Sequence, residues 1–377
     1  MRVRTIACLL GIALPVCVTL LLGFSVAMAQ SSGAAAGKRK QEAAKKGMIY
    51  LTREEILEGA KKEGRVVVAP GHDEDTRTAL TQAFKKNYPF IKEIDWRIVQ
   101  GNDGEQRQLL EMKAGRTTLD VFSPHAAYYN EYRKFNPFKK YDLKAMAQDG
   151  QLEVPLEMID DTGVVAWLGS MVGVVLYNSK TVPPDKAPTG WESCLDPQWK
   201  GKFTVDTKPI TLAHLLPRWG EERLFDFARK LKQNEPAWSR GGTATITRLV
   251  TGEFSLFCGA YLHTVQRLLK KDPTLPVKVV VPNPLGIGFL EPEAVYADAK
   301  RPHAGLLWID FLASKRGQEV VDSVNPGRGS LLVEGTVAYK LSTGTTVSLC
   351  GPGCFDRADQ LMQRIAVEAW GFPKAGK

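Results

Sequence analysis

The chain has 377 residues, of which 44% are apolar and 24% charged, and its formal net charge is +9. The apolar content is ample for folded cores, and the length is enough for two domains of ordinary size. After the first 29 residues, no apolar stretch is long enough to span a membrane, which excludes a multispanning membrane protein. The mild basic excess suits an anionic ligand without requiring one.

The first 29 residues have the pattern of an export signal. Arg2 and Arg4 precede an apolar run from Thr5 to Val26, and Ala27-Met28-Ala29 forms a small-x-small cleavage site. A retained membrane anchor is the alternative, since the run is long enough to span a bilayer. The cleavage site favours removal, so we predict a signal peptide over residues 1–29 and a periplasmic protein.

Residues 30–47 are small at first and then basic. Five of the nine residues from Lys38 to Lys46 are Lys or Arg. We predict a flexible basic linker here. An exported protein gives such a segment no nucleic acid to bind, so we expect no nucleic-acid partner.

The next hundred residues alternate apolar runs with amphipathic stretches. Thr52-Arg53-Glu54-Glu55 has the pattern of a capping box that opens a helix to about Glu63. Strands are predicted at 66–69, 94–98 and 119–122, with helices at about 74–88 and 105–114 between them. This order predicts a parallel sheet with helical crossovers. Ligands of such sheets bind beyond the carboxyl ends of the strands, which here are the loops 71–75, 101–105 and 123–127.

A second α/β region follows. Its predicted strands cover 164–167, 172–177, 203–205, 256–258 and 277–281, and its predicted helices cover 220–232, 243–251 and 264–271. Two further helices are predicted at 304–313 and 317–324.

Four cysteines remain after residue 29, and an exported protein can form disulfides. Cys350 and Cys354 flank Gly-Pro-Gly, so a local bridge is compatible with the turn chemistry between them. Cys258 lies in an apolar run, which predicts a buried free thiol.

Several sequence phrases then occur in one order along the chain. They are Ala83-Phe84 to Tyr88-Pro89, Asp120-Val121-Phe122, Gly173 to Ser179, Asp196-Pro197-Gln198-Trp199-Lys200-Gly201-Lys202, Thr251-Gly252-Glu253 and Asp310 to Gln318. In this order they resemble the periplasmic solute-binding proteins of ABC importers, and specifically their ferric ion-binding branch. The resemblance covers roughly residues 64–335.

The resemblance implies a periplasmic-binding-protein type II fold, with two α/β lobes, a central cleft and two crossing hinge strands. Lobe one would take residues 48–165 and 282–320, lobe two residues 166–281, and the helices of 321–377 would brace both. A monomer would close around its ligand and present it to an ABC permease in the inner membrane. The cargo would be a small molecule or a metal, with Fe(III) as a transported ligand.

The ferric branch coordinates iron through a histidine, a glutamate and two adjacent tyrosines. Glu105 matches the glutamate, and a carboxylate favoured by a helix start is its alternative role. The position of the family's histidine ligand falls on Asp73, which follows Gly71 and His72 in the same loop. The tyrosine pair is replaced by Leu262 and His263, preceded by Tyr261, so the resemblance implies Glu105, Tyr261 and His263 as metal ligands.

A small anion is the competing cargo. Arg240-Gly241-Gly242-Thr243 stands before a predicted helix, where backbone N–H groups of Gly242 and the Thr243 hydroxyl could hold an oxyanion. N-capping by Thr243 is the alternative. Arg328, in a later loop, could meet a carboxylate or phosphate.

Two other functions remain open from the sequence. One is a secreted enzyme acting on a small substrate, although the chain carries none of the common nucleophile, zinc-protease or phosphate-loop motifs. The other is a binding protein that feeds a sensor kinase. The resemblance favours a receptor that leaves its cargo chemically unchanged.

Overall fold

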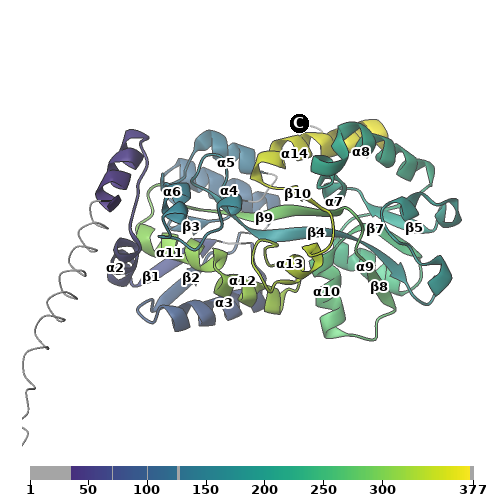
Figure 1. Ribbon diagram of the computed structural model, residues 1–377, viewed down its shortest axis with the longest axis horizontal. Coiled ribbons are helices and arrows are strands. Elements are labelled where there is room, and N and C mark those ends of the chain that lie inside the picture. Colours follow the sequence, from purple (N-terminus) through teal and green to yellow (C-terminus); the bar gives the residue numbers. More distant parts are fainter. Residues whose placement is uncertain (1–34, 70, 100, 125–127, 374–377) are drawn as a thin grey trace, which may run out of the picture.

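The computed structural model describes residues 35–69, 71–99, 101–124 and 128–373 (Figure 1). The predicted signal peptide lies outside the described residues. Helix α2 (Arg53–Glu63) begins with the predicted capping box, because the Thr52 hydroxyl accepts from the Glu55 N–H and the Glu55 carboxylate accepts from the Thr52 N–H. It ends at Gly64, whose φ of 66° is in the left-handed region that favours glycine.

Part of the predicted flexible linker is folded. Residues 35–45 form a helix in which Ala43 is buried. Arg39 donates to both carboxylate oxygens of Asp149 at 2.7 Å, and Lys40 pairs with Glu55. The prediction of a flexible linker is therefore wrong for these residues, because their partners lie far along the chain and were not visible in the local composition.

The first part of the chain forms the predicted alternation of strands and helices. Strand β1 pairs in parallel with β2 and with β3, and both connections are helical. The elements are β1 (Arg65–Ala69), α3 (Glu74–Asn87), β2 (Glu93–Trp96), α4 (Gly101–Lys113), β3 (Val121–Phe122), α5 (Tyr129–Phe135) and α6 (Leu143–Gln148). Helix α4 begins at Gly101, so the loop predicted over 101–105 is wrong.

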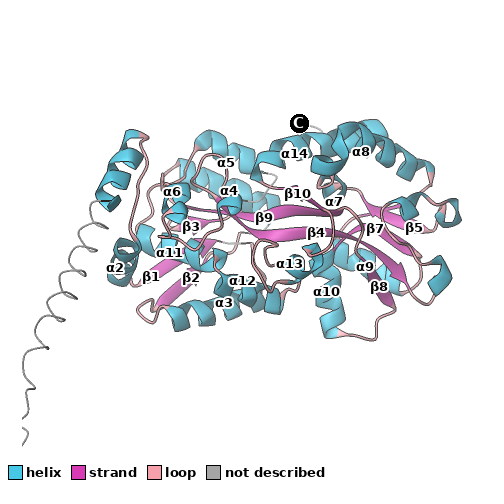
Figure 2. Cartoon of the chain, in the orientation of Figure 1, coloured by secondary structure: helices cyan, strands magenta, loops and turns pink. Residues whose placement is uncertain are grey.

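Two long antiparallel strands cross the middle of the molecule (Figure 2). Strand β4 (Ala166–Asn178) is continuous where the sequence predicts two strands, and β9 (Leu285–Val295) was not predicted. The first half of β4 pairs with β9, and its second half pairs with β7 and β8. The C-terminal end of β9 also pairs, in antiparallel orientation, with β3. Glycine in both segments, with serine in β4 and proline in β9, conceals their strand character, and pairing with distant partners stabilises them.

The second part of the chain extends the sheet beyond β4. The sheet order is β2-β1-β3-β9-β4-β7-β5-β6, with β8 also pairing with β4 and β10 with β9. The elements are β5 (Phe203–Asp206), α7 (Ile210–Ala213), α8 (Leu216–Gln233), β6 (Ala237–Ser239), α9 (Gly242–Val250), β7 (Leu256–Tyr261), α10 (Leu262–Lys271) and β8 (Val277–Val280). The final elements are α11 (Pro302–Ala313), α12 (Lys315–Val324), α13 (Val337–Ser342), β10 (Val347–Cys350) and α14 (Phe355–Arg364).

Apolar side chains fill both sides of each half of the sheet. Around β1 and β3, one cluster includes Phe84, Trp308 and Phe311, and another includes Phe122 and Tyr132. Around β5 and β7, separate clusters form with residues of α8 and of α9 and α10. The sheet is therefore covered by helices on both faces in each half, as in other α/β folds. The lobe boundaries predicted from the sequence remain a prediction.

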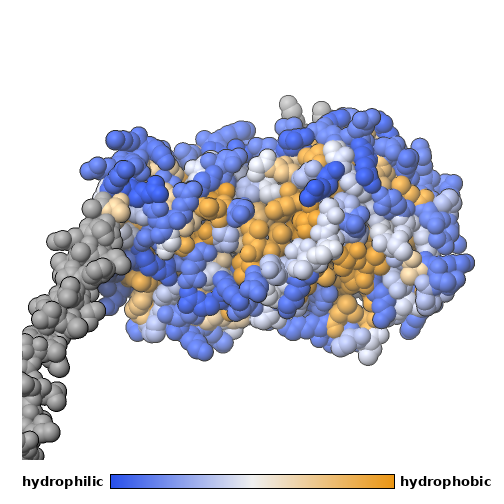
Figure 3. All heavy atoms as spheres, in the orientation of Figure 1, coloured by the Kyte–Doolittle hydropathy of each residue, from blue (hydrophilic) through white to orange (hydrophobic). Residues whose placement is uncertain are grey.

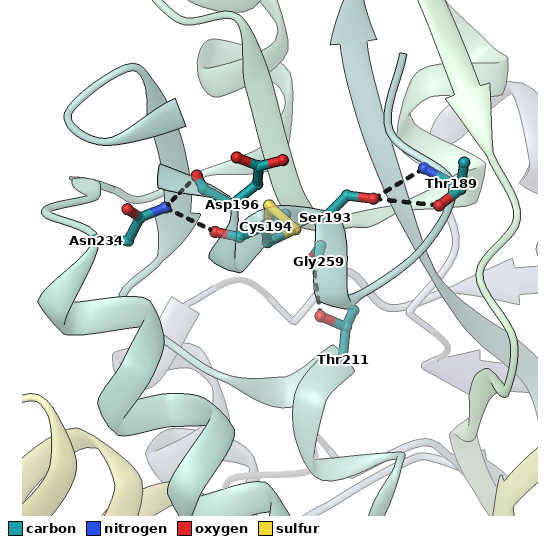
Figure 4. Close-up of a disulfide and its surroundings, with 8 residues drawn as sticks. Thr189, Ser193, Cys194, Asp196, Thr211, Asn234 and Gly259 are labelled. Atoms are coloured by element: carbon teal, nitrogen blue, oxygen red, sulfur yellow. Dashed lines mark hydrogen bonds between the residues drawn. A yellow bond between two sulfur atoms is a disulfide. The ribbon is translucent and has the colours of Figure 1, made fainter. Parts of the chain in front are cut away.

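Two disulfides cross-link the part of the chain that the structure describes. Cys258 of β7 is bonded to Cys194 of the short helix Glu192–Leu195, with the Cα atoms 6.3 Å apart, so the prediction of a free thiol is wrong (Figure 4). The Asn234 amide donates to the carbonyl oxygens of Cys194 and Asp196 and fixes this turn. The sequence spacing alone could not pair two cysteines 64 positions apart. Cys350 and Cys354 form the second, local disulfide.

In the part of the chain that the structure describes, no helix is both long and apolar enough to cross a bilayer.

Candidate ligand site at the crossing strands

The site is organised around Glu291, a buried acid in strand β9. Its φ of 58° is unusual for a residue with a side chain and costs on the order of 1–3 kcal/mol. A Cβ atom at Gly169 would lie 3.1 Å from Glu291 Oε2, and one at Gly71 would lie 3.9 Å from Oε1. Two glycines thus leave room for a carboxylate at the crossing strands.

Arg328 and His72 face this carboxylate. The Arg328 guanidinium forms an ion pair with Glu291, and His72 Nδ1 lies 3.4 Å from Glu291 Oε1. Burial opposes ionisation of Glu291, but the positive charge of Arg328 outweighs it and lowers the pKa of this carboxyl. Burial lowers the pKa of His72, although Glu291 acts in the opposite direction. The resulting state at neutral pH is an ionised Glu291–Arg328 pair beside a neutral His72.

Glu293 lies two residues further along β9 and is in the opposite protonation state. It is fully buried, and neither carboxylate oxygen has a hydrogen-bond partner among the described residues. Burial, followed by the charge of Glu291, raises the pKa of Glu293 well above its ordinary value. Arg328 is paired with Glu291 and does not neutralise Glu293. Glu293 is therefore buried as a neutral acid.

A rigid loop positions Arg328. Asp322 of α12 accepts hydrogen bonds from the Gly327 and Gly329 N–H groups through one oxygen, at 2.8 and 3.2 Å. The Ser170 N–H of β4 donates to the Arg328 carbonyl at 3.0 Å. This loop is therefore attached to both α12 and the crossing strand, which fixes the guanidinium over the site.

Two helix starts lie next to each other near this loop. Helix α9 has Gly241 as its N-cap, which has no side chain to cap the helix, and α10 has Tyr261, whose side chain accepts no hydrogen bond from the first turn. Neither first turn contains an acidic residue. A Cβ atom at Gly242 would lie 3.5 Å from Tyr261 Cδ2 and 3.4 Å from Thr264 Cγ2. Two positive helix ends thus lie side by side with no acidic residue in their own first turns.

Arg267 of α10 links these elements to the loop after β1. Its Nη1 lies 3.7 Å from Asp73 Oδ2, and its Nη2 donates to Thr243 Oγ1 at 3.4 Å. Asp73 caps α3 and also accepts from the Asn325 amide at 2.7 Å. The Arg267 contacts are longer than the 2.7–2.9 Å of strong charge-assisted bonds, so its guanidinium is only weakly engaged.

His263 contributes a buried nitrogen. Its Nδ1 has no hydrogen-bond partner in the described part of the chain, and its ring stacks on Tyr261 with centroids 5.9 Å apart. Burial, then the charges of Arg328 and Arg267, lowers the pKa of His263 to about 3. His263 lies in the first turn of α10, directly after Tyr261 at the end of β7 and Leu262, with its ring beside that of Tyr261.

The amino-acid sequence matches a known family over its middle part. The family's sequence profile, described as bacterial extracellular solute-binding protein, matches residues 119–333, which is more than half of the chain. The chain belongs to this solute-binding protein family. A relative from Haemophilus influenzae, an uncharacterized protein, is 28% identical over 274 residues, which cover 69% of this chain and 76% of that protein.

Solved structures share the fold of this solute-binding protein. Iron-bound HitA from Pseudomonas aeruginosa has a TM-score of 0.61 at 16% identity, over 80% of this chain and 99% of that one. Apo ferric ion-binding protein A from Pasteurella haemolytica has a TM-score of 0.63 at 14% identity, over 83% and 100%. The predicted type II periplasmic-binding-protein fold is thereby confirmed.

Most of the predicted ligand residues of this solute-binding protein converge in space. The contacts described above connect Gly71, His72, Asp73, Gly242, Thr243, Tyr261 and His263 through Glu291, Arg267 and Arg328. Thr243 is the second residue of α9 and not its N-cap, which is Gly241. The role of each residue in binding a solute remains a prediction.

Glu105 lies in a different set of contacts. It is buried in the second turn of α4 and not at the helix start, and the Tyr132 hydroxyl donates to it at 3.3 Å. Gln108 of the same helix donates to that hydroxyl at 2.8 Å. This network joins α4 to α5, and a ligand role for Glu105 remains a prediction.

The roles of Glu105, Tyr261 and His263 as metal ligands remain a prediction. Burial, followed by the nearby Asp206, raises the pKa of Tyr261, so its hydroxyl is protonated at neutral pH. Within the described ranges, no group of three or more His, Cys, Asp or Glu side chains could hold a metal ion. A metal would have to displace a proton from a buried phenol.

Sequence reasoning missed Glu291 and Arg267. Glu291 stands in the segment Leu-Glu-Pro-Glu after an apolar run, and two acids at the end of such a run could have indicated a buried polar site. Arg267 lies within a correctly predicted helix, but nothing in the local sequence distinguishes it from a solvent-facing arginine.

We expect buried His263 to lower the stability of this solute-binding protein as the pH decreases below 6.5, whereas the raised pKa of Glu293 acts in the opposite direction. His263 has a pKa of about 3 in the folded chain and an ordinary value of 6.5, so between these limits the unfolded chain binds more protons. His72 acts in the same direction. Urea unfolding at pH 7 and pH 5 measures the effect, and His263→Gln should reduce the difference between the two. An equal difference in the variant would show that His263 is not buried as a neutral group.

Proposed function

We propose that the chain is a periplasmic receptor that binds a small anion and delivers it to an ABC importer. Membership of the solute-binding family supports the receptor role. The proposed anion rests on one arrangement: two adjacent helix starts without acidic residues, with the weakly engaged Arg267 beside them. Backbone N–H groups at helix starts and a guanidinium are the groups that proteins use for oxyanions.

The geometry suggests how the anion would be held. Its oxygens would replace Asp73 and Thr243 as partners of Arg267, whose present contacts at 3.7 and 3.4 Å leave better hydrogen bonds available. The partnerless His263 Nδ1 would complete the set. Arg328 is already paired with the ionised Glu291, so we assign it to fixing the site and not to the ligand's main charge.

A thermal-shift screen of the purified protein against phosphate, sulfate, citrate and small phosphate esters tests the proposal. A ligand at one hundred times its Kd should stabilise the folded chain by about 2.7 kcal/mol. Arg267→Met should weaken binding at least tenfold, because it removes the weakly engaged guanidinium that would face the anion. Lys271→Met, at the exposed far end of the same helix, is the matched control and should bind normally. If no anion stabilises the protein, or if both variants bind alike, the proposed site is wrong.

Ferric iron, alone or with an anion, is the second candidate because structures with this fold include iron-bound HitA and a ferric ion-binding protein A. Glu291, Asp73 and Tyr261 offer oxygen donors near the same place. Addition of ferric citrate followed by absorption spectroscopy separates the two candidates. A tyrosinate band that disappears in Tyr261→Phe would favour iron, and stabilisation by citrate alone without colour would favour the anion.

We further propose that the receptor leaves its solute unchanged and acts as a monomer with an inner-membrane permease as partner. The family consists of binding proteins, which supports this view. Mass spectrometry of the released solute checks it, because recovery of a chemically altered compound would indicate an enzyme.

A further inference from the structure

Asp206 is a buried acid at the carboxyl end of strand β5. It is only 7% exposed, whereas Figure 3 shows hydrophilic residues over most of the visible surface. Aspartate is rarely buried to this extent unless it is paired. Among the described residues, however, Asp206 forms no ion pair, and its carboxylate accepts a single hydrogen bond, from the Lys208 N–H to Oδ1 at 2.9 Å. The usual reason for burying an aspartate is therefore missing here.

The second carboxylate oxygen of Asp206 is available to a ligand. Oδ2 has no hydrogen-bond partner in the described part of the chain, yet it is not one of the polar atoms that are fully enclosed without a partner. Solvent therefore reaches this oxygen although the residue as a whole is buried. With Oδ1 fixed to the backbone, Oδ2 is held in one place and can accept a hydrogen bond from outside the protein.

The strand geometry directs Asp206 toward the two helix starts of the proposed anion site. Side chains alternate between the two faces of a strand, and Phe203 and Val205 pack in the cluster that includes residues of α8. Asp206 thus lies on the opposite face, where residues of α9 and α10 pack against β7. Strand β5 pairs in parallel with β6 and β7, so their carboxyl ends meet at one edge. The partner of Asp206 in β6 is Ser239, two residues before the α9 N-cap Gly241.

Electrostatic effects connect Asp206 to the same two helix starts. Burial, followed by the charge of Asp206, raises the pKa of the Tyr261 phenol, and Tyr261 is the N-cap of α10. Burial also raises the pKa of Asp206, although the Lys208 N–H and then the charges of Lys208 and Arg240 oppose it. Arg240 directly precedes the α9 N-cap. An acid therefore lies where the helix starts and Arg267 otherwise favour an anion.

A carboxylate inside an anion site distinguishes anions by their hydrogens. It repels an oxygen that carries no hydrogen, and it accepts a charge-assisted hydrogen bond from a hydroxyl. An anion that keeps a hydroxyl can therefore use all the groups of the site, whereas one without a hydroxyl meets an unrelieved like charge.

We propose that Asp206 restricts the site to oxyanions that carry a hydroxyl group on their central atom, such as hydrogen phosphate, and rejects sulfate. The hydroxyl donates to Asp206 Oδ2, while the other oxygens face Arg267 and the starts of α9 and α10. The selection rests on the proposed function and narrows its solute to a phosphorus oxyanion that keeps a proton at neutral pH.

Inorganic phosphate, monofluorophosphate and sulfate are the probes. At neutral pH phosphate carries at least one hydroxyl, monofluorophosphate has a fluorine in its place, and sulfate carries no hydrogen. Calorimetric titration of the folded chain measures the three affinities. We expect the wild type to bind phosphate at least a hundredfold more tightly than either of the others, because only phosphate donates to the carboxylate. This comparison does not depend on any variant.

Asp206→Asn tests the residue itself. Its amide can still accept from the Lys208 N–H and can also donate to an oxygen without a hydrogen, so the preference for phosphate over sulfate should fall at least tenfold. Asp196→Asn is the matched control. Asp196 Oδ1 likewise accepts from the N–H two residues later, at 3.0 Å, and among the described residues its carboxylate bonds only to Gln198. This variant should keep the wild-type preference, and thermal unfolding establishes that both variants are folded.

The outcomes separate the selection from the proposed function. If the wild type binds the three anions alike and Arg267→Met weakens all of them, the anion site is correct and the selection by Asp206 is wrong. An unchanged preference in folded Asp206→Asn would also overturn the selection. If none of the anions binds, or if Arg267→Met binds them as the wild type does, the proposed function fails and the selection fails with it.

Discussion

Arg328→Met is expected to destabilise the folded chain by about 3–5 kcal/mol, because it leaves the Glu291 carboxylate buried without its partner. Only about 6% of the Glu291 side chain is exposed, so water cannot replace the guanidinium. Equilibrium unfolding in urea measures the loss. The φ of 58° at Glu291 adds to the effect, since the strained backbone is held in place by the contacts of its side chain.

The double variant Arg328→Met/Glu291→Gln identifies the origin of this loss. Removing the charge along with its partner should restore most of the lost stability, since the penalty comes from the unpaired charge and not from the missing pair. Arg316→Met is the matched control. It breaks the Arg316–Glu153 ion pair, whose side chains are 49% and 46% exposed, and should cost no more than about 1 kcal/mol. A double variant as unstable as Arg328→Met would refute the charge argument.

Removal of the Cys194–Cys258 disulfide should have a comparably large effect. The bond closes a loop between positions 64 apart, and chain entropy predicts a loss of about 4 kcal/mol for Cys194→Ala/Cys258→Ala. Both cysteines are buried, so the lost packing adds to this cost. Alanine avoids the burial of a polar hydroxyl that serine would introduce. Guanidinium unfolding followed by tryptophan fluorescence provides the measurement.

The local disulfide is the control. Cys350→Ala/Cys354→Ala opens a bond between positions only four apart and should cost about 2 kcal/mol on the same model. A larger loss from the local pair than from the long-range pair would mean that loop closure does not govern these disulfides.

The sequence predicted the first part of the fold well. The capping box at Thr52 and the alternation of β1, α3, β2, α4 and β3 depend on residues close together in the chain. Helices α9 to α12 were predicted for the same reason. The family resemblance then supplied the overall fold, which the solved structures confirm.

The site was predicted only in part. His72 and Thr243 were proposed because they stand at the ends of predicted elements, where ligands of α/β proteins bind, and Asp73 and Tyr261 because of the family resemblance. Their roles in binding remain predictions. Glu291 was missed because β9 was not predicted. Arg267 was missed because its partners come from other elements.

The sequence by itself determined the export pattern, the local helices and strands, and the class of fold, because periodicity, caps and turn residues act over a few positions. Tertiary structure decided the rest: the continuous crossing strands, the Cys194–Cys258 bond, the ionised Glu291 beside a neutral Glu293, and the partnerless nitrogen of His263. These features depend on burial and on contacts between distant segments. Burial and distant charges set a protonation state, and neither can be read from neighbouring residues.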